Sequence, residues 1–186
     1  MKKVYYSVDQ REEEQKNLKT KALQGAYDIV STFCSSILAV TIVLVCFLRV
    51  AIVNGTSMVP TLHDGQSIIF SPFLSSFKTG DIVVIHREDE EALIKRVIAT
   101  SGQTIDIDFE KGTVEVDGIV LEEPYIAEKT EREFEGGPKF PLTIPEGYIF
   151  VLGDNRNNSL DSRSPNVGLI NEQYVVGKMI FSLEAN

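Results

Sequence analysis

Three short segments of this 186-residue chain, residues 54–62, 92–99 and 153–163, carry side chains whose types and spacing could do chemistry. Residues 54–62 (NGTSMVPTL) form a turn with Ser57 near its middle. Residues 92–99 (ALIKRVIA) form an apolar run that contains Lys95. A serine hydroxyl attacks a carbonyl carbon only after a base removes its proton, so the sequence has to supply that base.

The two histidines of the chain are poor candidates for the base. A Ser-His-Asp arrangement requires a histidine that an acid holds in place. His63 precedes Asp64 in what resembles a surface turn, and His86 leads into the charged stretch 87–91. Their spacing has no metal-site signature, and we expect neither a metal ion nor another cofactor.

Lys95 is the other candidate base, provided that its pKa falls well below the free value of about 10.4. Burial among apolar groups lowers the pKa of a lysine, because burial penalises the charged ammonium. Strand alternation places Lys95 on one face with Leu93, Val97 and Ala99. The pattern alone favours the alternative, a lysine at a sheet edge with its ammonium in solvent.

Residues 153–163 (GDNRNNSLDSR) are a dense polar stretch directly after the apolar run 148–152. A surface loop could have this composition, although such loops rarely follow a buried strand so abruptly. Asp161 and Arg163 can pair and brace the loop. Ser159 could form a hydrogen bond that aims a neutral lysine amine.

Residues 29–48 contain no charged side chain. As a helix they would be roughly 30 Å long, the thickness of the hydrocarbon core of a bilayer. The apolar part of a cleaved signal peptide is typically about 7–15 residues, so we expect an uncleaved anchor in the lipid bilayer. The expected organisation is a tail at 1–28, the anchor and its exit at 29–53, and a catalytic domain at 54–186.

Flanking charges predict the orientation of this anchor. Six Lys or Arg residues precede it, whereas Arg49 is the only one for many residues after it. The positive-inside rule then places the N-terminus in the cytoplasm and the domain outside. From Val50 onward the chain has 11 basic and 22 acidic residues, which argues against a nucleic acid partner. Both cysteines lie in the apolar run, so no disulfide framework is expected after it.

Short β-type runs separated by turn signals follow the anchor, which predicts a mainly β domain, a folded antiparallel sheet or barrel. Residues 122–141 are polar and read as a long connection or flap, and the one short helix expected lies near 170–173. Residues 73–77 (FLSSF) could enter the bilayer surface or pack in the core. The expected strands are 67–70, 82–85, 92–99, 104–109, 113–116, 119–121, 148–152 and 174–183.

Taken together, the segments around Ser57, around Lys95 and at 153–163, in this order after a membrane span, resemble type I signal peptidases. These are membrane-anchored serine proteases with a Ser-Lys dyad, and the single span and small domain resemble the Gram-positive branch. The resemblance implies that signal-peptide-bearing preproteins are the substrates, cut after small residues at the first and third positions before the scissile bond. It extends from residue 29 nearly to the C-terminus.

The resemblance also implies a role for each matching residue. Ser57 would be the nucleophile, its main-chain N–H would stabilise the oxyanion, and Lys95 would be the general base. Ser159 would orient the lysine. Four residues would give structural support, namely Asp154, Arg156, Asp161 and Arg163.

Two positions depart from the family pattern. Gly55 stands where some relatives have a serine whose hydroxyl helps the oxyanion hole, which leaves one obvious donor. Gln103 follows Gly102 where the family usually has aspartate, which puts an accessory turn contact in doubt.

Two other functions remain to be compared with proteolysis. The first is a non-proteolytic homologue that assists assembly of surface proteins or pilins, although such a protein usually loses a dyad residue. The second is a self-cleaving repressor, which shares Ser-Lys chemistry and the β-fold. A repressor would require a DNA-binding module and an internal Ala-Gly cleavage site, and the sequence has neither.

Overall fold

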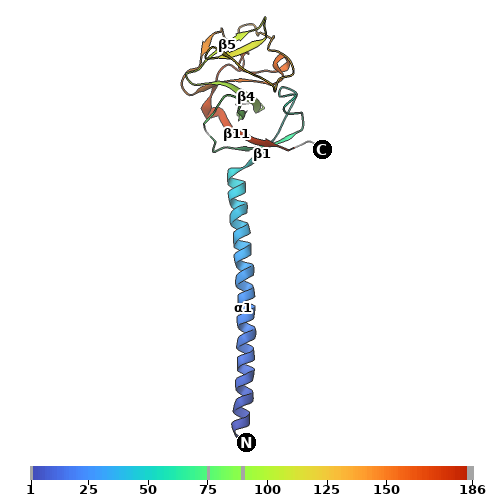
Figure 1. The fold of residues 1–186 in the computed structure, drawn as a ribbon, viewed down its shortest axis with the longest axis vertical. Helices are drawn as coiled ribbons and strands as arrows, with labels where there is room; N and C mark the ends of the chain where they lie inside the picture. Colours follow the sequence, from blue (N-terminus) through green and yellow to red (C-terminus); the bar gives the residue numbers. More distant parts are fainter. Residues whose placement is uncertain (1, 75, 89–90, 184–186) are drawn as a thin grey trace. The chain divides into compact units, whose positions relative to one another are not determined.

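The structure is a computed structural model that describes residues 2–74, 76–88 and 91–183. Contacts divide the chain into two units, residues 1–46 and 47–186. The first unit contains helix α1 (Lys2–Phe47) except for its last residue, Phe47, and the second unit contains all the strands (Figure 1). The predicted fold class, mainly β with one N-terminal helix, is confirmed.

Helix α1 contains one segment, Gln10–Phe47, that is long and apolar enough to cross a membrane. Hydroxyl groups in an apolar solvent need an internal acceptor, and the helix supplies one from its own backbone. Thr32 donates to the carbonyl of Asp28, four residues earlier, at 2.8 Å, and Ser35 does the same to Ser31 at 2.8 Å. Ser36 and Thr41 bond in the same way, so these four hydroxyl groups are satisfied within the helix.

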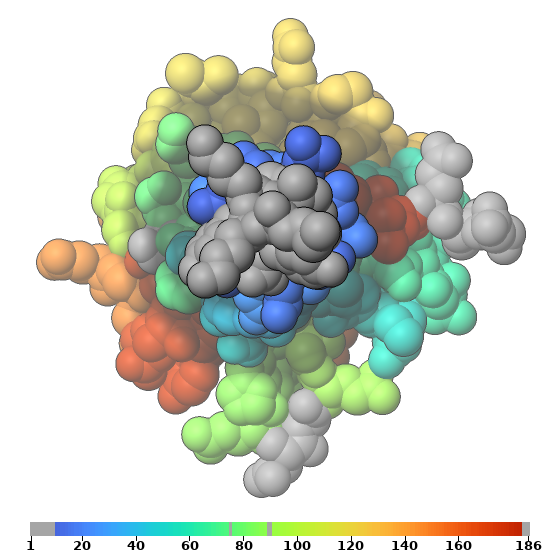
Figure 2. Space-filling model, turned by 90° about the horizontal axis from the view of Figure 1, so that it is seen from below, coloured from blue at the N-terminus to red at the C-terminus, as the bar shows by residue number. Residues whose placement is uncertain are grey.

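The larger sheet has seven antiparallel strands in the order β1-β2-β11-β3-β4-β9-β10. The smaller has four antiparallel strands in the order β7-β6-β5-β8, and Figure 2 shows residues of this sheet, in yellow, along one side of the β unit. The strands of the larger sheet are β1 (Arg49–Ile52), β2 (Ser67–Ser71), β3 (Ile82–Ile85), β4 (Leu93–Thr100), β9 (Tyr148–Leu152), β10 (Ile170–Asn171) and β11 (Val175–Ser182). Those of the smaller are β5 (Thr104–Asp108), β6 (Thr113–Val116), β7 (Ile119–Val120) and β8 (Leu142–Thr143). Two 3₁₀ turns complete the unit, η1 (Arg156–Asn158) and η2 (Glu172–Tyr174).

Three clusters of buried side chains form the core, and β4 contributes to all of them. One cluster joins the two sheets through residues such as Ile98, Ile105 and Phe150. A second packs Met58 and Leu62 against β2, β3 and β4. Because β4 lies inside the sheet and is covered on both faces, any side chain on it is held in a fixed surrounding.

Each predicted strand is present, with its ends within one residue of the prediction, whereas β1, β8 and β10 lie outside the predicted strands. The exit of the anchor was expected to extend to residue 53, but Arg49–Ile52 form β1, which pairs with β2. The simple alternation expected in β4 is also broken, because the ladder with β9 shifts register between Val97 and Ala99. Ala99 therefore packs in the cluster that joins the sheets, together with its neighbour Ile98.

The apolar segment 73–77 was left between entry into the bilayer surface and packing in the core, and contact with the bilayer stays a prediction. Phe73 and Leu74 are exposed, whereas Phe77 packs against a core cluster. The short helix expected near residues 170–173 is the 3₁₀ turn η2, which follows the two residues of β10. The 122–141 connection forms no regular helix or strand, and two of its side chains, those of Thr130 and Glu123, are buried.

Candidate active site

The Ser57 turn, residues 54–62, is anchored by two buried apolar side chains that follow the serine in the chain. Met58 is 1% exposed and Leu62 is fully buried, and the Leu62 N–H donates to the Met58 carbonyl at 2.9 Å. At the start of the turn, Val53 and Gln66 are joined by a backbone hydrogen bond of 2.8 Å. The core thus fixes the residue after Ser57 and leaves the Ser57 side chain half-buried.

Lys95 lies on β4 opposite Val83 of β3, and it is only 3% exposed. Its Nζ atom lies 2.8 Å from Ser57 Oγ and donates to the Ile94 carbonyl at 3.0 Å. Burial lowers the pKa of Lys95 from 10.5 to about 8, against the charges of Asp161 and Asp154, which raise it. The alternative of a lysine at a sheet edge with a solvated ammonium is therefore wrong.

A cleft of about 170 Å³ opens beside the two side chains. Ser57 and Lys95 lie at its wall, and neither histidine is among its described lining residues. The other residues that line it are Val53, Asn54, Met58, Glu91, Ala92, Leu93, Ile94 and Leu160. A lysine that lines a cleft at hydrogen-bond distance from a serine can remove the serine's proton once the amine is neutral.

The 153–163 loop contacts the Ser57 turn through two asparagines. The Asn155 N–H donates to the Ser57 carbonyl at 3.0 Å, and the Asn155 side chain donates to the Thr56 carbonyl at 3.1 Å. The Asn158 side chain donates to Thr56 Oγ1 at 3.1 Å. These three bonds join segments that are about a hundred residues apart in the sequence.

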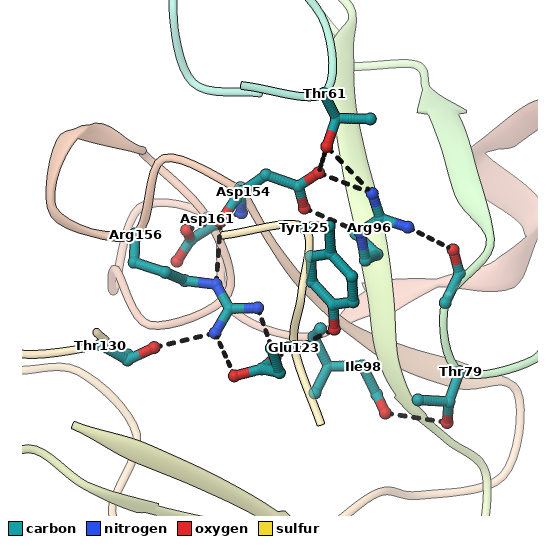
Figure 3. Close-up of polar contacts among 12 residues, drawn as sticks. Thr61, Thr79, Arg96, Ile98, Glu123, Tyr125, Thr130, Asp154, Arg156 and Asp161 are labelled. Atoms are coloured by element: carbon teal, nitrogen blue, oxygen red, sulfur yellow. Dashed lines mark hydrogen bonds and ion pairs between the residues drawn. The ribbon is translucent and has the colours of Figure 1, made fainter. Parts of the chain in front are cut away.

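The other predicted residues of this loop form buried ion pairs. Asp154 pairs with Arg96, the residue after Lys95, at 2.6 and 2.8 Å and also accepts from Thr61 (Figure 3). Asp161 and Arg163, which were expected to pair, do so with two contacts of 2.9 Å. Asp161 also accepts from the Gly153 N–H at 3.0 Å.

Arg156 is the fourth of the residues expected to give structural support, and its side chain is fully buried. Its guanidinium donates to both carboxylate oxygens of Glu123, at 2.6 and 2.8 Å, and to Thr130 Oγ1 of the same connection at 2.8 Å (Figure 3). Burial acts to lower the pKa of Arg156, but the hydrogen bonds and the charge of Glu123 outweigh it and raise that pKa. The cation is therefore stable inside the protein.

Ser159 is 3% exposed, and its hydroxyl has no hydrogen-bond partner among the residues that the structure describes. The expected hydrogen bond from Ser159 to Lys95 is therefore not formed in this structure. The hydroxyl lies against Gly153, where an added Cβ would collide with the Ser159 side chain and with the Ser57 carbonyl. Ser159, Gly153 and Ser57 are thus packed against one another.

The two departures from the family pattern have different structural consequences. Gly55 has φ +83°, and its N–H donates to Asp64 Oδ1 at 2.7 Å, so it shapes the turn without presenting a side chain. Gln103 does make a turn contact, because its Oε1 accepts from the Thr100 N–H at 3.0 Å and its Nε2 donates to Asp117 at 3.1 Å. A glutamine therefore braces this turn through its amide.

Sequence reasoning missed several residues at the site. Leu160 and Glu91 line the cleft, and Leu160 is the one apolar residue within GDNRNNSLDSR, a signal that could have identified it. Arg96, for which the sequence suggested no role, pairs with Asp154. Glu123 had no local signal, because its partner Arg156 is 33 residues away.

Comparisons with known proteins agree on one family. The sequence profile of the family described as "Signal peptidase, peptidase S26" matches residues 26–183. Signal peptidase I T of Bacillus subtilis is 38% identical over 139 residues, which cover 70% of each chain. Signal peptidase I U of the same organism is 33% identical over 168 residues, covering 86% of this chain and 88% of its own. A solved signal peptidase I from Enterococcus faecalis is 30% identical, covers 55% of this chain and 96% of its own, and has a TM-score of 0.47.

Proposed function

Because this chain belongs to the signal peptidase S26 family, we propose that Ser57 and Lys95 are the dyad with which it cleaves signal peptides from exported preproteins. The protein is a membrane-anchored serine endopeptidase, with α1 as its anchor. Ser57 is the nucleophile and Lys95 the general base. One observation carries this assignment: Lys95 Nζ lies 2.8 Å from Ser57 Oγ while the lysine is buried.

The pKa of about 8 supports Lys95 as the base, because an appreciable fraction of the amine is neutral near neutral pH. Neutral Nζ takes the hydroxyl proton as Oγ attacks the scissile carbonyl carbon. The ammonium then gives this proton to the leaving amine as the peptide bond breaks. Water, deprotonated by the same amine, attacks the acyl-enzyme, and Ser57 Oγ leaves with the proton from Lys95.

The main-chain N–H of Ser57 stabilises the negative oxygen that forms in each addition step. Among the described residues, this N–H donates to no backbone carbonyl, which supports its being free to bind the oxyanion. Gly55 offers no hydroxyl as a second donor. Ser159 orients Lys95 during the reaction, since its hydroxyl is buried beside Gly153 and, having no described hydrogen-bond partner, is available to the amine.

The cleft beside the dyad supports an extended substrate with small side chains. Its volume is about 170 Å³, and much of its wall is apolar, from Val53, Met58, Leu93, Ile94 and Leu160. A signal peptide would lie along this wall as an added strand does, with its backbone held and alternate side chains directed into the cleft. Small residues at the first and third positions before the cut fit that space.

The positive charge before the span supports an N-terminus in the cytoplasm and a catalytic unit on the other side of the membrane. Residues 10–28 carry four of the six basic residues that precede the apolar stretch. The substrate reaches the same side when its signal peptide crosses the bilayer. Reactivity of single cysteines with a membrane-impermeant reagent, at exposed positions such as Glu122 and Leu18, tests this orientation.

The test of the dyad is cleavage of a preprotein by the full chain in detergent. Ser57→Ala and Lys95→Met should abolish formation of the mature N-terminus, which mass spectrometry identifies. Ser76→Ala and Lys111→Met change the same residue types at exposed positions and should retain activity. Cleavage by Ser57→Ala at the wild-type rate would refute the assignment. An inactive wild-type chain would instead favour the assembly-factor alternative, which the intact dyad does not favour.

A further inference from the structure

The 122–141 connection contacts Arg96 and Arg156, although none of its described residues lines the cleft. It contains no regular strand or helix, yet Thr130 is fully buried and the Glu123 side chain is 7% exposed. Both of these side chains contact the same guanidinium, that of Arg156. The connection is therefore fixed to the β unit at a defined place.

The contact between Glu123 and Arg156 is a buried, two-pronged ion pair. Both carboxylate oxygens bind the guanidinium, a geometry that fixes the orientation of both side chains as well as their distance. Arg156 Nε then donates to the Gly153 carbonyl at 3.1 Å. Glu123 is thus connected through one side chain to the residue that packs against Ser57 and Ser159.

Tyr125 makes a second contact from the same connection, to the neighbour of Lys95. The guanidinium carbon of Arg96 lies 3.9 Å from the centroid of the Tyr125 ring, a cation–π distance. The Tyr125 hydroxyl donates to Glu123 Oε1 at 3.0 Å, so the two side chains act as one unit (Figure 3). Figure 3 shows the Tyr125 ring between the two arginines, Arg96 on one side and Arg156 on the other.

The path from this unit to Ser57 is short. Arg156 is the first residue of η1. Asn155 immediately precedes η1 and donates to the carbonyls of Ser57 and Thr56, and Asn158, the last residue of η1, donates to the Thr56 hydroxyl. Asn157, also in η1, accepts from the N–H groups of Glu131 and Arg132 at 3.2 and 3.1 Å. Every residue of η1 therefore contacts either the connection or the turn.

We propose that Glu123 and Tyr125 are positioning residues, which set the place of Ser57 relative to Lys95 through Arg156 and Arg96. This rests on the proposed roles of Ser57 and Lys95. The 2.8 Å separation of these two side chains depends on holding two segments in register, and a shift of about 1 Å can reduce a rate by roughly a hundredfold. The connection is in this sense part of the active-site framework, and it contributes to turnover without touching the substrate.

Glu123→Gln tests the proposal, since it removes one charge and almost no volume. We expect kcat to fall on the order of tenfold, with KM unchanged within about twofold, because alignment and not substrate binding is disturbed. Glu122→Gln is the matched control: the same substitution at the adjacent, exposed residue should leave kcat unchanged. Hydrogen exchange at the Asn155 amide reports the bond to Ser57 directly and should accelerate in Glu123→Gln but not in Glu122→Gln.

A double variant shows whether Glu123 acts through its arginine. In an Arg156→Met background, Glu123→Gln should cause no further loss of kcat. Tyr125→Phe removes only the hydroxyl donor to Glu123 and provides a milder variant, with an expected loss of about twofold to threefold, should the others fold poorly.

The proposal would be overturned if Glu123→Gln lowered the melting temperature while kcat per folded molecule and Asn155 exchange stayed at wild-type values. A loss confined to KM would overturn it as well, since that would place Glu123 in substrate binding. Asn155 exchange does not depend on catalysis. A failed dyad assignment, seen as an active Ser57→Ala variant, is therefore distinguishable from a failed positioning role.

Discussion

Lys95 and Arg96 are adjacent on β4, but among the described residues a carboxylate pairs with Arg96 and none pairs with Lys95. Asp154 binds the guanidinium of Arg96 with both oxygens, while the Lys95 amine contacts a hydroxyl and a carbonyl. Asp154 therefore affects Lys95 only at a distance, and burial dominates the lysine's pKa. Of these two consecutive residues, Arg96 is therefore a cation paired with a carboxylate, and Lys95 is an amine with a lowered pKa.

The pH dependence of the rate should follow the titration of Lys95. With a pKa of about 8 the neutral fraction of the amine rises about tenfold between pH 7 and pH 9, and kcat/KM should rise with it. Initial rates of preprotein cleavage by the full chain in detergent, from pH 6 to pH 10, measure this. A flat profile across that range would contradict Lys95 as the base.

Replacing Lys95 should make the protein more stable near neutral pH. Below pH 8 the lysine is charged in both states, and the folded state then carries the whole cost of burying the charge. The lowering of the pKa from 10.5 to about 8 corresponds to a cost of about 3 kcal/mol. Lys95→Met removes this cost and should raise the free energy of unfolding by as much as that amount at pH 7.

The same linkage sets the pH window of the effect. Between pH 8 and pH 10.5 the unfolded chain binds a proton that the folded chain does not, so the stability of the wild type rises with pH. The advantage of Lys95→Met should therefore shrink through this window. Denaturant titrations at pH 7 and pH 10 measure it, and an advantage that did not change with pH would contradict the assigned cause.

Ser159→Ala should separate stability from catalysis. The hydroxyl is buried without a described partner, so its removal should leave the free energy of unfolding unchanged or raise it by about 1 kcal/mol. If Ser159 orients the neutral amine during the reaction, kcat should fall by about tenfold or more. Thermal unfolding and cleavage kinetics on one preparation measure both, and full activity would exclude the orienting role.

Gly153→Ala should disturb the site by direct collision. An added Cβ would lie 2.5 Å from the Ser57 carbonyl oxygen and against the Ser159 side chain, so the turn must move. We expect kcat to fall on the order of a hundredfold.

Gly118→Ala is the control for this substitution. Gly118 has φ +77° but open space around it, so alanine there should cost about 1 kcal/mol of stability and leave kcat intact. If both substitutions reduced kcat equally, the close contact at Gly153 would not be the cause.

The sequence was informative where one segment determines its own structure. The β-branched runs of β3, β4 and β9 predicted buried strands, and these strands bring Lys95 and the 153–163 loop to the site. The three motifs were recognised because each is a continuous stretch and they occur in a fixed order after a membrane span. Contacts between residues that lie far apart in the sequence could not be predicted in this way.

Two features show why the remainder could not be predicted. Arg49–Ile52 directly follows the apolar run, and only pairing with β2 makes this stretch a strand. Arg156 lies in a segment whose composition is that of a solvated loop, yet it is fully buried because Glu123 and Thr130 meet it there. In both cases the deciding interaction comes from another part of the chain, so no local pattern reports it.

Strand β1 begins two residues after the end of α1, and it forms one edge of the larger sheet. Its pairing with β2 covers a row of backbone donors and acceptors that would otherwise be free to join another chain. A shortened protein that starts at Asn54 would lack this cover and would tend to self-associate through β2. A shortened protein that lacks the anchor and does not self-associate through β2 must therefore begin at or before Arg49.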